Sequence, residues 1–418
     1  MPAPLSTGCV RVCETGRLTF VPDRQAGRNG AAGGIPGPWS PSVMALAALM
    51  LAAFSYLTVE TLPVGLLPAI AGDLSVSLSA VGLLVTGYGL TVAVASLPLT
   101  HLRRRVPRRH LLSGLLTVFV AATGVSVLRP SYTTLLAGRV ATALSQAVFW
   151  SIAAPAAAAL FSPHLRGRVT AALFGGASLA LVLGVPAATW LGQQAGWRAA
   201  FLAVGGLGLL SLVGIAAFVP TTRPEEGHAA TGSSPDAARY WIIIVATAVA
   251  ITGVFAAYTY IAPFLTEVSG FSPQAITPLL LTFGVAGLGG VTVAGVLVDR
   301  FPRAAVLSPV ALLTVTLLAL YLLGTNQVAT VALVALWGFA LPQVPSTFQA
   351  RVLQIAPGST DLASAVFSAV FNLGIAAGAL TGGLLLSHTG VRSAYLIGAG
   401  LTGVALAVLL SKETPRCQ

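Results

Sequence analysis

Long apolar stretches recur along the whole chain, and they limit what it can fold into more than any other feature. A helix needs about 18 or more apolar residues to cross a hydrocarbon core of about 30 Å. Of the 418 residues, 56% are hydrophobic and only 8% are charged, whereas a soluble domain carries about a quarter charged residues. The sequence therefore predicts a protein that crosses a membrane many times.

The apolar stretches are rich in Gly, Ala and Pro as well as Leu and Val. Small residues let helices pack closely in lipid, and neighbouring helices satisfy the backbone groups that Pro leaves free. The short alternating segments of a membrane β-barrel are absent from the sequence. We expect an all-α membrane protein with spans at about 43–66, 79–100, 111–128, 132–160, 169–191, 198–219, 240–266, 274–298, 304–324, 328–347, 361–386 and 392–411.

The net charge of +11 comes mainly from basic residues beside the ends of these stretches. Their position indicates membrane topology and argues against a nucleic-acid partner. The even-numbered loops carry most of them, as in RRRVPRR and HLRGR, whereas the opposite loops carry few. By the positive-inside rule, we expect both termini in the cytoplasm and the protein in the cell membrane.

The chain also repeats itself. An offset of about 195 places Pro68 on Pro263 and Arg105 on Arg300, which matches the second and third spans with the eighth and ninth. Repeats of six spans are the architecture of one large class of secondary transporter. We expect a disordered cytoplasmic tail at 1–42, a six-helix half at 43–220, a cytoplasmic linker at 221–239, a second six-helix half at 240–411 and a cytoplasmic tail at 412–418.

Glu60 lies inside the first apolar stretch, within YLTVETLPVGLLPAIAGD. A charge near the middle of a span costs about 2.5 to 3.5 kcal/mol on insertion scales, and a carboxylate escapes that cost by taking up a proton. We interpret Glu60 as a proton carrier. The alternatives are a neutral glutamic acid that only holds helices together, or one close enough to the surface to stay solvated.

Four segments match a known family pattern: VETLPVGLLPAIAGDL, AGRVATALSQAVFWSIAAPAAAALF, GGASLALVLGVPAATWLGQQAGWRAAF and YTYIAPFLTEVSGFS. Together they resemble the major facilitator superfamily, in its twelve-span drug/proton antiporter branch near the bacterial sugar-efflux and chloramphenicol-resistance transporters. The resemblance covers about residues 43 to 411. It implies two six-helix halves, transport driven by a proton gradient, and no cofactor.

One signature of that family is the loop after the second span, Gly-x-x-x-Asp-Arg-x-Gly-Arg-Arg, which latches the helices. The second-half copy, GVLVDRFPR, keeps Gly295, Asp299, Arg300 and Arg303 in register. In the first half, Arg104 stands where the Asp is expected, so the usual charge pair cannot form. The basic residues of this loop are either gating residues or a membrane-surface anchor; they include Arg105, Arg108 and Arg109.

A second signature is an arginine in the fourth span, here Arg139, which the resemblance associates with proton coupling. By helix rise it lies about 10 Å deep. A buried guanidinium cannot be neutralised, so it needs acceptors or a water-filled cavity. The alternative is a residue that snorkels toward the headgroups. Where the family often has a His-Gly pair, this chain has Ser145 and Gln146.

The third signature is a Gly- and Pro-rich pattern in the fifth span. The chain carries Gly176, Gly184 and Pro186 there. Glycine permits close packing and proline removes a helical hydrogen bond, so we expect a bend. The match is partial, because Val185 separates Gly184 from the proline.

Polar and aromatic residues in five spans are candidates for a central substrate cavity between the halves. The aromatic ones are equally compatible with packing or interfacial positions. Asp73 and Glu267, at the extracellular ends of the first and seventh spans, are expected to be structural or gating residues. The cavity candidates are Tyr56, Gln146, Trp150, Tyr258, Tyr260, Gln343, Gln349 and Asn372.

These observations favour a monomeric proton-coupled efflux antiporter for small neutral or amphipathic molecules, such as sugars or phenicol-type antibiotics. A facilitator or proton symporter that imports a nutrient would have the same fold. An integral membrane enzyme is a third reading, but the sequence holds no nucleophile motif or phosphate-binding loop. We expect no metal site, and we interpret Cys9 and Cys13 as incidental thiols.

Overall fold

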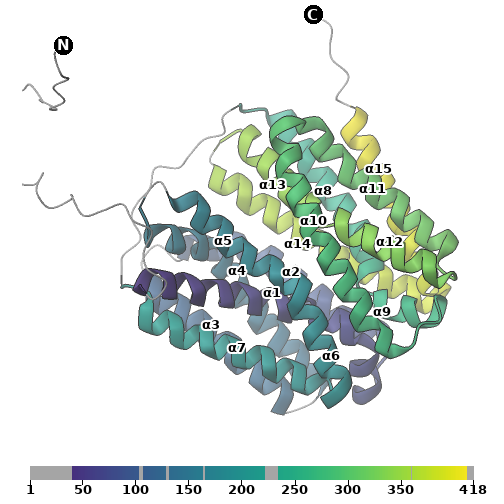
Figure 1. The fold of residues 1–418 in the computed structure, drawn as a ribbon, viewed down its shortest axis with the longest axis horizontal. Coiled ribbons are helices and arrows are strands. Elements are labelled where there is room, and N and C mark those ends of the chain that lie inside the picture. The colour runs from purple at the N-terminus through teal and green to yellow at the C-terminus, as the bar shows by residue number, and fades with distance from the viewer. Residues whose placement is uncertain are drawn as a thin grey trace, which may run out of the picture. The chain divides into compact units, whose positions relative to one another are not determined.

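The computed structural model describes residues 40–102, 107–128, 131–162, 165–221, 234–358 and 360–411. Throughout these ranges the regular structure is helical (Figure 1), which confirms the all-α class. Several parts of the expected organisation lie outside the described residues: 1–39 in the tail, 222–233 in the linker, the tail at 412–418, and Arg105.

The first half contains six membrane-spanning segments. One of them is built from two α-helices joined by a π-helical turn, so that α5, η3 and α6 run continuously. The elements are α1 (Pro41–Leu74), α2 (Leu78–Leu102), α3 (Arg108–Leu128), α4 (Tyr132–Ala159), α5 (Arg166–Leu179), η3 (Ala180–Gly184), α6 (Val185–Ala195) and α7 (Trp197–Phe218).

The second half contains six further segments, three of which are also divided into shorter elements. The bounds are α8 (Ala237–Tyr258), α9 (Ile261–Pro263), η4 (Phe264–Val268), η5 (Pro273–Ala275), α10 (Ile276–Arg300), α11 (Pro302–Leu323), α12 (Gln327–Ala340), α13 (Gln343–Ile355), α14 (Thr360–Thr389) and α15 (Val391–Ser411).

The internal repeat of the sequence reappears in the helix starts. α4 begins at Tyr132 and α12 at Gln327, which are 195 residues apart. Several of these starts carry capping residues that accept from the first free backbone N–H groups. Asp236 caps α8 by accepting from the N–H of Arg239 at 3.0 Å, and Asn326 caps α12 by accepting from that of Ala329 at 3.0 Å.

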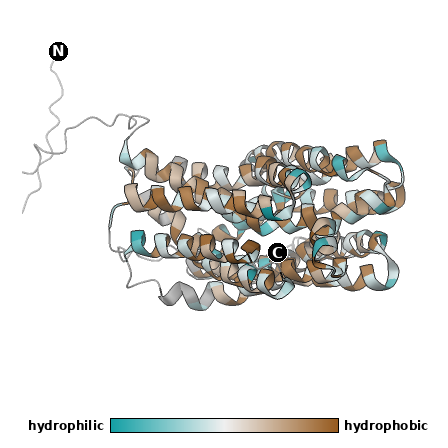
Figure 2. Cartoon of the chain, turned by 90° about the horizontal axis from the view of Figure 1, so that it is seen from below, coloured by the Kyte–Doolittle hydropathy of each residue, from teal (hydrophilic) through white to brown (hydrophobic). Residues whose placement is uncertain are grey.

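Within the described residues, eleven helices or helix runs are long and apolar enough to cross a membrane. α4, which carries Arg139, is not among them. With α4 they account for the twelve expected spans. Hydrophobic residues dominate the helices, and hydrophilic residues gather toward the loops (Figure 2). Large apolar side chains are widely exposed, as at Val94 and Leu210, which suits a surface that faces lipid.

Glycines bring helices of the two halves into backbone contact. A Cβ added at Gly89 in α2 would lie 2.9 Å from the backbone oxygen of Asn372 in α14. One added at Gly284 in α10 would lie 2.6 Å from the backbone oxygen of Leu181 in η3. Small residues at such crossings permit the close approach that membrane helices use in place of a hydrophobic driving force.

Hydrogen bonds also join the halves at one end of the bundle. We call this the Asp73 end, because the loop between α1 and α2 lies there; the opposite end, where α3 begins, is the Arg108 end. Ser79 Oγ donates to the carbonyl of Gly383 at 2.8 Å. Gln193 Nε2 donates to the carbonyl of Pro273 at 2.7 Å, and Gln193 Oε1 accepts from Thr277 at 3.0 Å. The halves are therefore closed against each other at the Asp73 end.

Candidate functional site

Three helices, α1, α2 and α4, build a cluster of polar side chains around Glu60. Glu60 is half-buried, and its Oε2 accepts a hydrogen bond from Gln146 Nε2 at 2.7 Å. Arg139 lies next to it and is only 2% exposed. The structure thus brings together three of the predicted residues, from spans that are far apart in the sequence.

Arg139 is held by the backbone of α1. Its Nη1 donates to the carbonyl of Val59 at 2.5 Å and its Nη2 to the carbonyl of Glu60 at 2.8 Å. The Val59 carbonyl needs an outside donor because the residue four positions later is Pro63, which has no N–H. An unsatisfied carbonyl inside a membrane costs several kcal/mol, in the range of about 2 to 7. Arg139 therefore satisfies the acceptor that Pro63 leaves free.

The carboxylate of Glu60 has a neutral partner. Both Glu60 and Arg139 are described, yet they form no ion pair within 4.0 Å. The guanidinium is occupied by the two carbonyls, while the carboxylate is bonded to an amide. A neutral hydrogen-bond partner leaves the carboxyl group free to gain or lose a proton without breaking an ion pair.

Tyr88 in α2 completes the cluster, and the sequence analysis did not predict it. Its hydroxyl donates to Gln146 Oε1 at 2.5 Å, and the Arg139 guanidinium carbon lies 4.3 Å from its ring centroid. Such a cation–π contact stabilises a buried guanidinium. The available signal in the sequence was a single tyrosine between two glycines within an otherwise apolar span, in the segment TGYGL.

Two of the predicted aromatic residues in this half lie in different surroundings. Tyr56 is fully buried between Phe119 and Phe149, and its hydroxyl donates to Ser145 Oγ at 3.1 Å. Trp150 is half-buried, one helical turn along α4 from Gln146. Its ring is parallel to that of Phe174 in α5, with the centroids 5.8 Å apart.

The candidates in the second half do not join the cluster around Glu60. Tyr258 packs against Phe283 and Trp337. Tyr260 donates from its hydroxyl to the carbonyl of Ala379 at 3.0 Å, and a Cβ at Gly82 of α2 would overlap that hydroxyl. The amides of the others bond nearby: Gln343 to the carbonyl of Phe339 in α12, Asn372 to a carbonyl of its own helix, and Gln349 to Ser364.

The fifth span contains the expected glycines and proline around a π-helical turn, Ala180–Gly184, which comes directly before Val185 and Pro186. A Cβ at Gly176 would lie 2.9 Å from the backbone oxygen of Met50 in α1, and one at Gly184 would overlap Thr58. These glycines allow the fifth span to pack against α1, the helix that carries Glu60.

The charged residues of the loops are spread over both ends. Asp73 accepts from Arg198 at 2.7 Å and from Trp197 Nε1 at 3.0 Å, while Glu267 is exposed in η4. The side chain of Asp299 lies outside the described set. The other gating candidates lie at helix ends: Arg108 and Arg109 in α3, Gly295 and Arg300 in α10, and Arg303 in α11.

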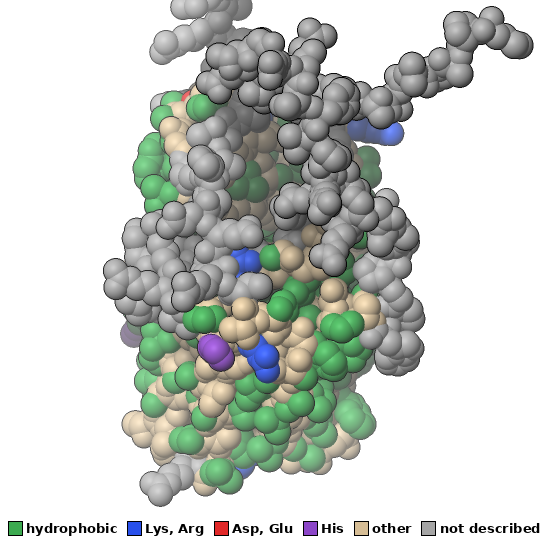
Figure 3. Space-filling model, turned by 90° about the vertical axis from the view of Figure 1, so that its left-hand side faces the viewer, with side chains coloured by type: hydrophobic (Ala, Val, Ile, Leu, Met, Phe, Trp, Pro, Cys, Tyr) green, Lys and Arg blue, Asp and Glu red, His purple; other side chains and the backbone are tan. Residues whose placement is uncertain are grey.

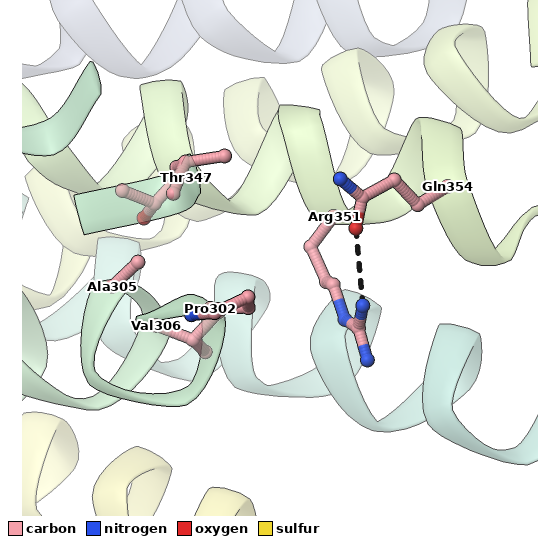
Figure 4. A pocket seen from close by; sticks show the side chains of 7 residues that line it. Pro302, Ala305, Val306, Thr347, Arg351 and Gln354 are labelled. Carbon is pink, nitrogen blue, oxygen red and sulfur yellow. Dashed lines mark hydrogen bonds between the residues drawn. The ribbon is translucent and has the colours of Figure 1, made fainter. Parts of the chain in front are cut away.

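A small pocket lies beside the second copy of the loop signature, at the junction of α10, α11 and α13 (Figure 4). Arg351 lines it and donates to Gln354 Oε1, one turn along the same helix, at 3.0 Å. Its lining belongs entirely to the second half, so it is separate from the cluster around Glu60. The residues that the structure describes hold no group of three His, Cys, Asp or Glu side chains suited to a metal.

Comparison with known proteins gives a consistent result. The sequence profile of the Major Facilitator Superfamily matches residues 49–361. A relative from Mannheimia succiniciproducens, described as a "Probable sugar efflux transporter", is 36% identical over 365 residues, which are 86% of this chain and 91% of the relative.

Two solved structures share the fold at 18% identity. The human organic anion transporter MFSD10 (TETRAN) superposes with a TM-score of 0.67 over 88% of this chain and 100% of its own. A bacterial homologue of the human lysosomal transporter Spinster, solved in an inward-facing and unoccupied conformation, superposes with a TM-score of 0.61. The match covers 90% of this chain and 96% of its own.

Proposed function

This chain belongs to the major facilitator superfamily and is a multi-pass membrane transporter, not an enzyme; from that premise we propose that it exports small molecules in exchange for protons. The observation that carries the proposal is the position of Glu60. It is a half-buried carboxylate inside a membrane helix, and an amide, not the adjacent arginine, is its partner. Ionisable groups at membrane depth are costly, and they mark proton pathways.

Arg139 supports the same role from the neighbouring helix. Arg139 keeps a positive charge beside Glu60, and it stays in place because α1 supplies its acceptors. Glu60 then loads a proton when the site faces the acidic side and releases it when the site faces the other. Substrate takes the place of the proton on the return step. The proton gradient is the energy source, and the proposal includes no cofactor.

For the substrate class, we propose neutral or amphipathic molecules with a ring, sugars first. One relative carries sugar efflux in its description. Trp150 and Phe174 present parallel rings one helical turn from Gln146. Phe174 is 50% exposed. An aromatic face suits the apolar face of a sugar ring.

We further propose that the Arg108 end is cytoplasmic and that the protein works as a monomer in the cell membrane. The surface on the side where α1 begins shows several Lys or Arg side chains and little acidic surface among its described atoms (Figure 3). This distribution follows the positive-inside rule. The hydrogen bonds between the halves at the Asp73 end then close the outer side, which corresponds to an inward-facing state.

The proposal is tested by following proton movement in inverted membrane vesicles while sugars and amphipathic antibiotics are added one at a time. We expect at least one compound to dissipate the gradient with the native protein and not with Glu60→Gln. Asp236→Asn is the matched control, because it neutralises a loop carboxylate and keeps the helix cap. Transport of a compound without proton movement would identify a facilitator and refute the antiport.

A further inference from the structure

We propose that Gln146 and Tyr88 transmit the protonation state of Glu60 to the contact between α2 and α14. The inference rests on the proposed function, because it gives a consequence to proton uptake at Glu60. It assigns a positioning role to Tyr88. It also explains how a proton bound in one half can act on the interface with the other.

The geometry is a chain of two hydrogen bonds through one amide. Gln146 Nε2 donates to Glu60 Oε2 at 2.7 Å, and Gln146 Oε1 accepts from the Tyr88 hydroxyl at 2.5 Å. Gln146 and Tyr88 are 3% and 1% exposed, so water cannot readily replace either partner. The orientation of the Gln146 amide therefore fixes which group donates in each of the two hydrogen bonds.

Protonation reverses this order. A proton that arrives from solvent forms an O–H bond at Glu60 Oε2 and turns that oxygen from an acceptor into a donor. A donor now faces the Gln146 N–H group, and the amide turns so that its oxygen accepts from Glu60. The amide N–H group then points at the Tyr88 oxygen, and the Tyr88 hydroxyl hydrogen must find another acceptor.

Tyr88 is placed to pass this change to the other half. Its side chain contacts α4, while the next residue, Gly89, packs against the backbone of α14. A Cβ at Gly89 would lie 2.9 Å from the Asn372 backbone oxygen and 3.2 Å from the Ala376 nitrogen. Asn372 Oδ1 is buried and has no hydrogen-bond partner, so the residue whose backbone meets Gly89 also carries an unused acceptor.

The same two helices extend to the closed end of the molecule. Ser79 in α2 donates to the carbonyl of Gly383 in α14 at 2.8 Å. A shift of α2 at Tyr88 is therefore carried to the contact that closes the Asp73 end. The charged and titratable side chains next to these two hydrogen bonds are Arg139 from α4 and Tyr56 from α1, and α14 meets α2 here through the backbone of Asn372.

The test measures how pH changes access to the Asp73 end, and it needs no substrate. In the full chain with its three cysteines replaced by serine, Ser79→Cys is labelled with a membrane-impermeant maleimide. Each rate is divided by that of Ser131→Cys, an exposed loop position, at the same pH. We expect labelling to change about fivefold as the pH is lowered through the titration of Glu60, because one buried hydrogen bond is rearranged.

The variants separate this inference from the proposed function. Glu60→Gln, Tyr88→Phe and Gln146→Leu should each flatten the pH profile, and the double variant Tyr88→Phe with Gln146→Leu should be no flatter than either single one. Tyr132→Phe is the matched control: it removes a hydroxyl that also joins α4 to α2, by donating to Ala80 at 2.7 Å near the Asp73 end. It should keep the full response.

The outcomes are distinct. If the parent shows no pH response, or if Glu60→Gln keeps it, the proton site itself is refuted. If Glu60→Gln abolishes the response but Tyr88→Phe and Gln146→Leu retain it, the proton site stands and the transmission through Tyr88 is overturned.

Discussion

Arg139 Nη1 donates to the carbonyl of Val59 at 2.5 Å, across the contact between α4 and α1. The bond exists because Pro63 cannot donate to Val59 within α1. The Arg139 guanidinium thus supplies the hydrogen-bond donor that the Val59 carbonyl lacks because of Pro63. The guanidinium is therefore bonded to backbone carbonyls of α1, and the Glu60 carboxylate is bonded to the Gln146 amide instead.

This relationship predicts that Arg139 and Pro63 are energetically coupled. Arg139→Leu should destabilise the protein by about 1 to 3 kcal/mol, because the buried Val59 carbonyl loses its donor. Pro63→Ala restores an N–H group for the Val59 carbonyl, so the same change should cost less in that background. Thermal unfolding of the four proteins in detergent measures the coupling, and additive effects would contradict it.

The contact between α2 and α14 predicts that a single methyl group prevents closure. Gly89→Ala places a Cβ 2.9 Å from the Asn372 backbone oxygen, and a backbone atom cannot move aside as a side chain can. We expect labelling at Ser79→Cys to increase about tenfold, because the clash disfavours the closed state. Gly114→Ala is the control, since nothing lies within 4 Å of its Cβ. Equal labelling in both variants would show that α2 tolerates the methyl group.

Gln193 is predicted to hold the Asp73 end closed. It makes two hydrogen bonds to the other half, and both are lost in Gln193→Ala. We expect faster labelling at Ser79→Cys by about two- to fivefold, a modest effect because one of the two bonds is exposed. Gln327→Ala is the matched control. The Gln327 amide also donates to two carbonyls, those of Ser269 and Gly270, but these lie in the same half as Gln327. An equal effect of the two variants would argue against a latch.

The aromatic pair makes a prediction about affinity. Trp150→Leu and Phe174→Leu should each raise KM for a transported sugar about five- to tenfold with little change in maximal rate, because they remove ring contact made before the conformational change. Trp190→Leu provides the control, since that ring is 54% exposed on the fifth span and stacks on no other aromatic ring among the described residues. An unchanged KM in Trp150→Leu would remove Trp150 from the binding surface.

The sequence was most informative where a property repeats over many residues. Apolar length predicts the twelve spans, and the offset of 195 predicts the equivalence of α4 and α12, because both depend on many positions at once. Glu60 and Arg139 were identifiable because a charge in an apolar stretch is conspicuous.

Contacts between helices were much harder to predict. Tyr88 was missed because a tyrosine in an apolar span is compatible with simple packing, and only the crossing of α2 and α4 brings it to Gln146. The loss of the Val59 donor follows from Pro63 alone, but the identity of the replacement donor depends on how α4 lies against α1. Single sequences carry little information on such crossings.

The most direct test of the account is proton-driven accumulation by the purified protein in liposomes. An imposed proton gradient should drive a transported sugar against its own gradient with the native protein. Glu60→Gln should retain exchange of labelled for unlabelled sugar and lose accumulation, because substrate exchange needs no protonation step. Accumulation by Glu60→Gln at the native level would contradict the assignment of Glu60 as the proton carrier.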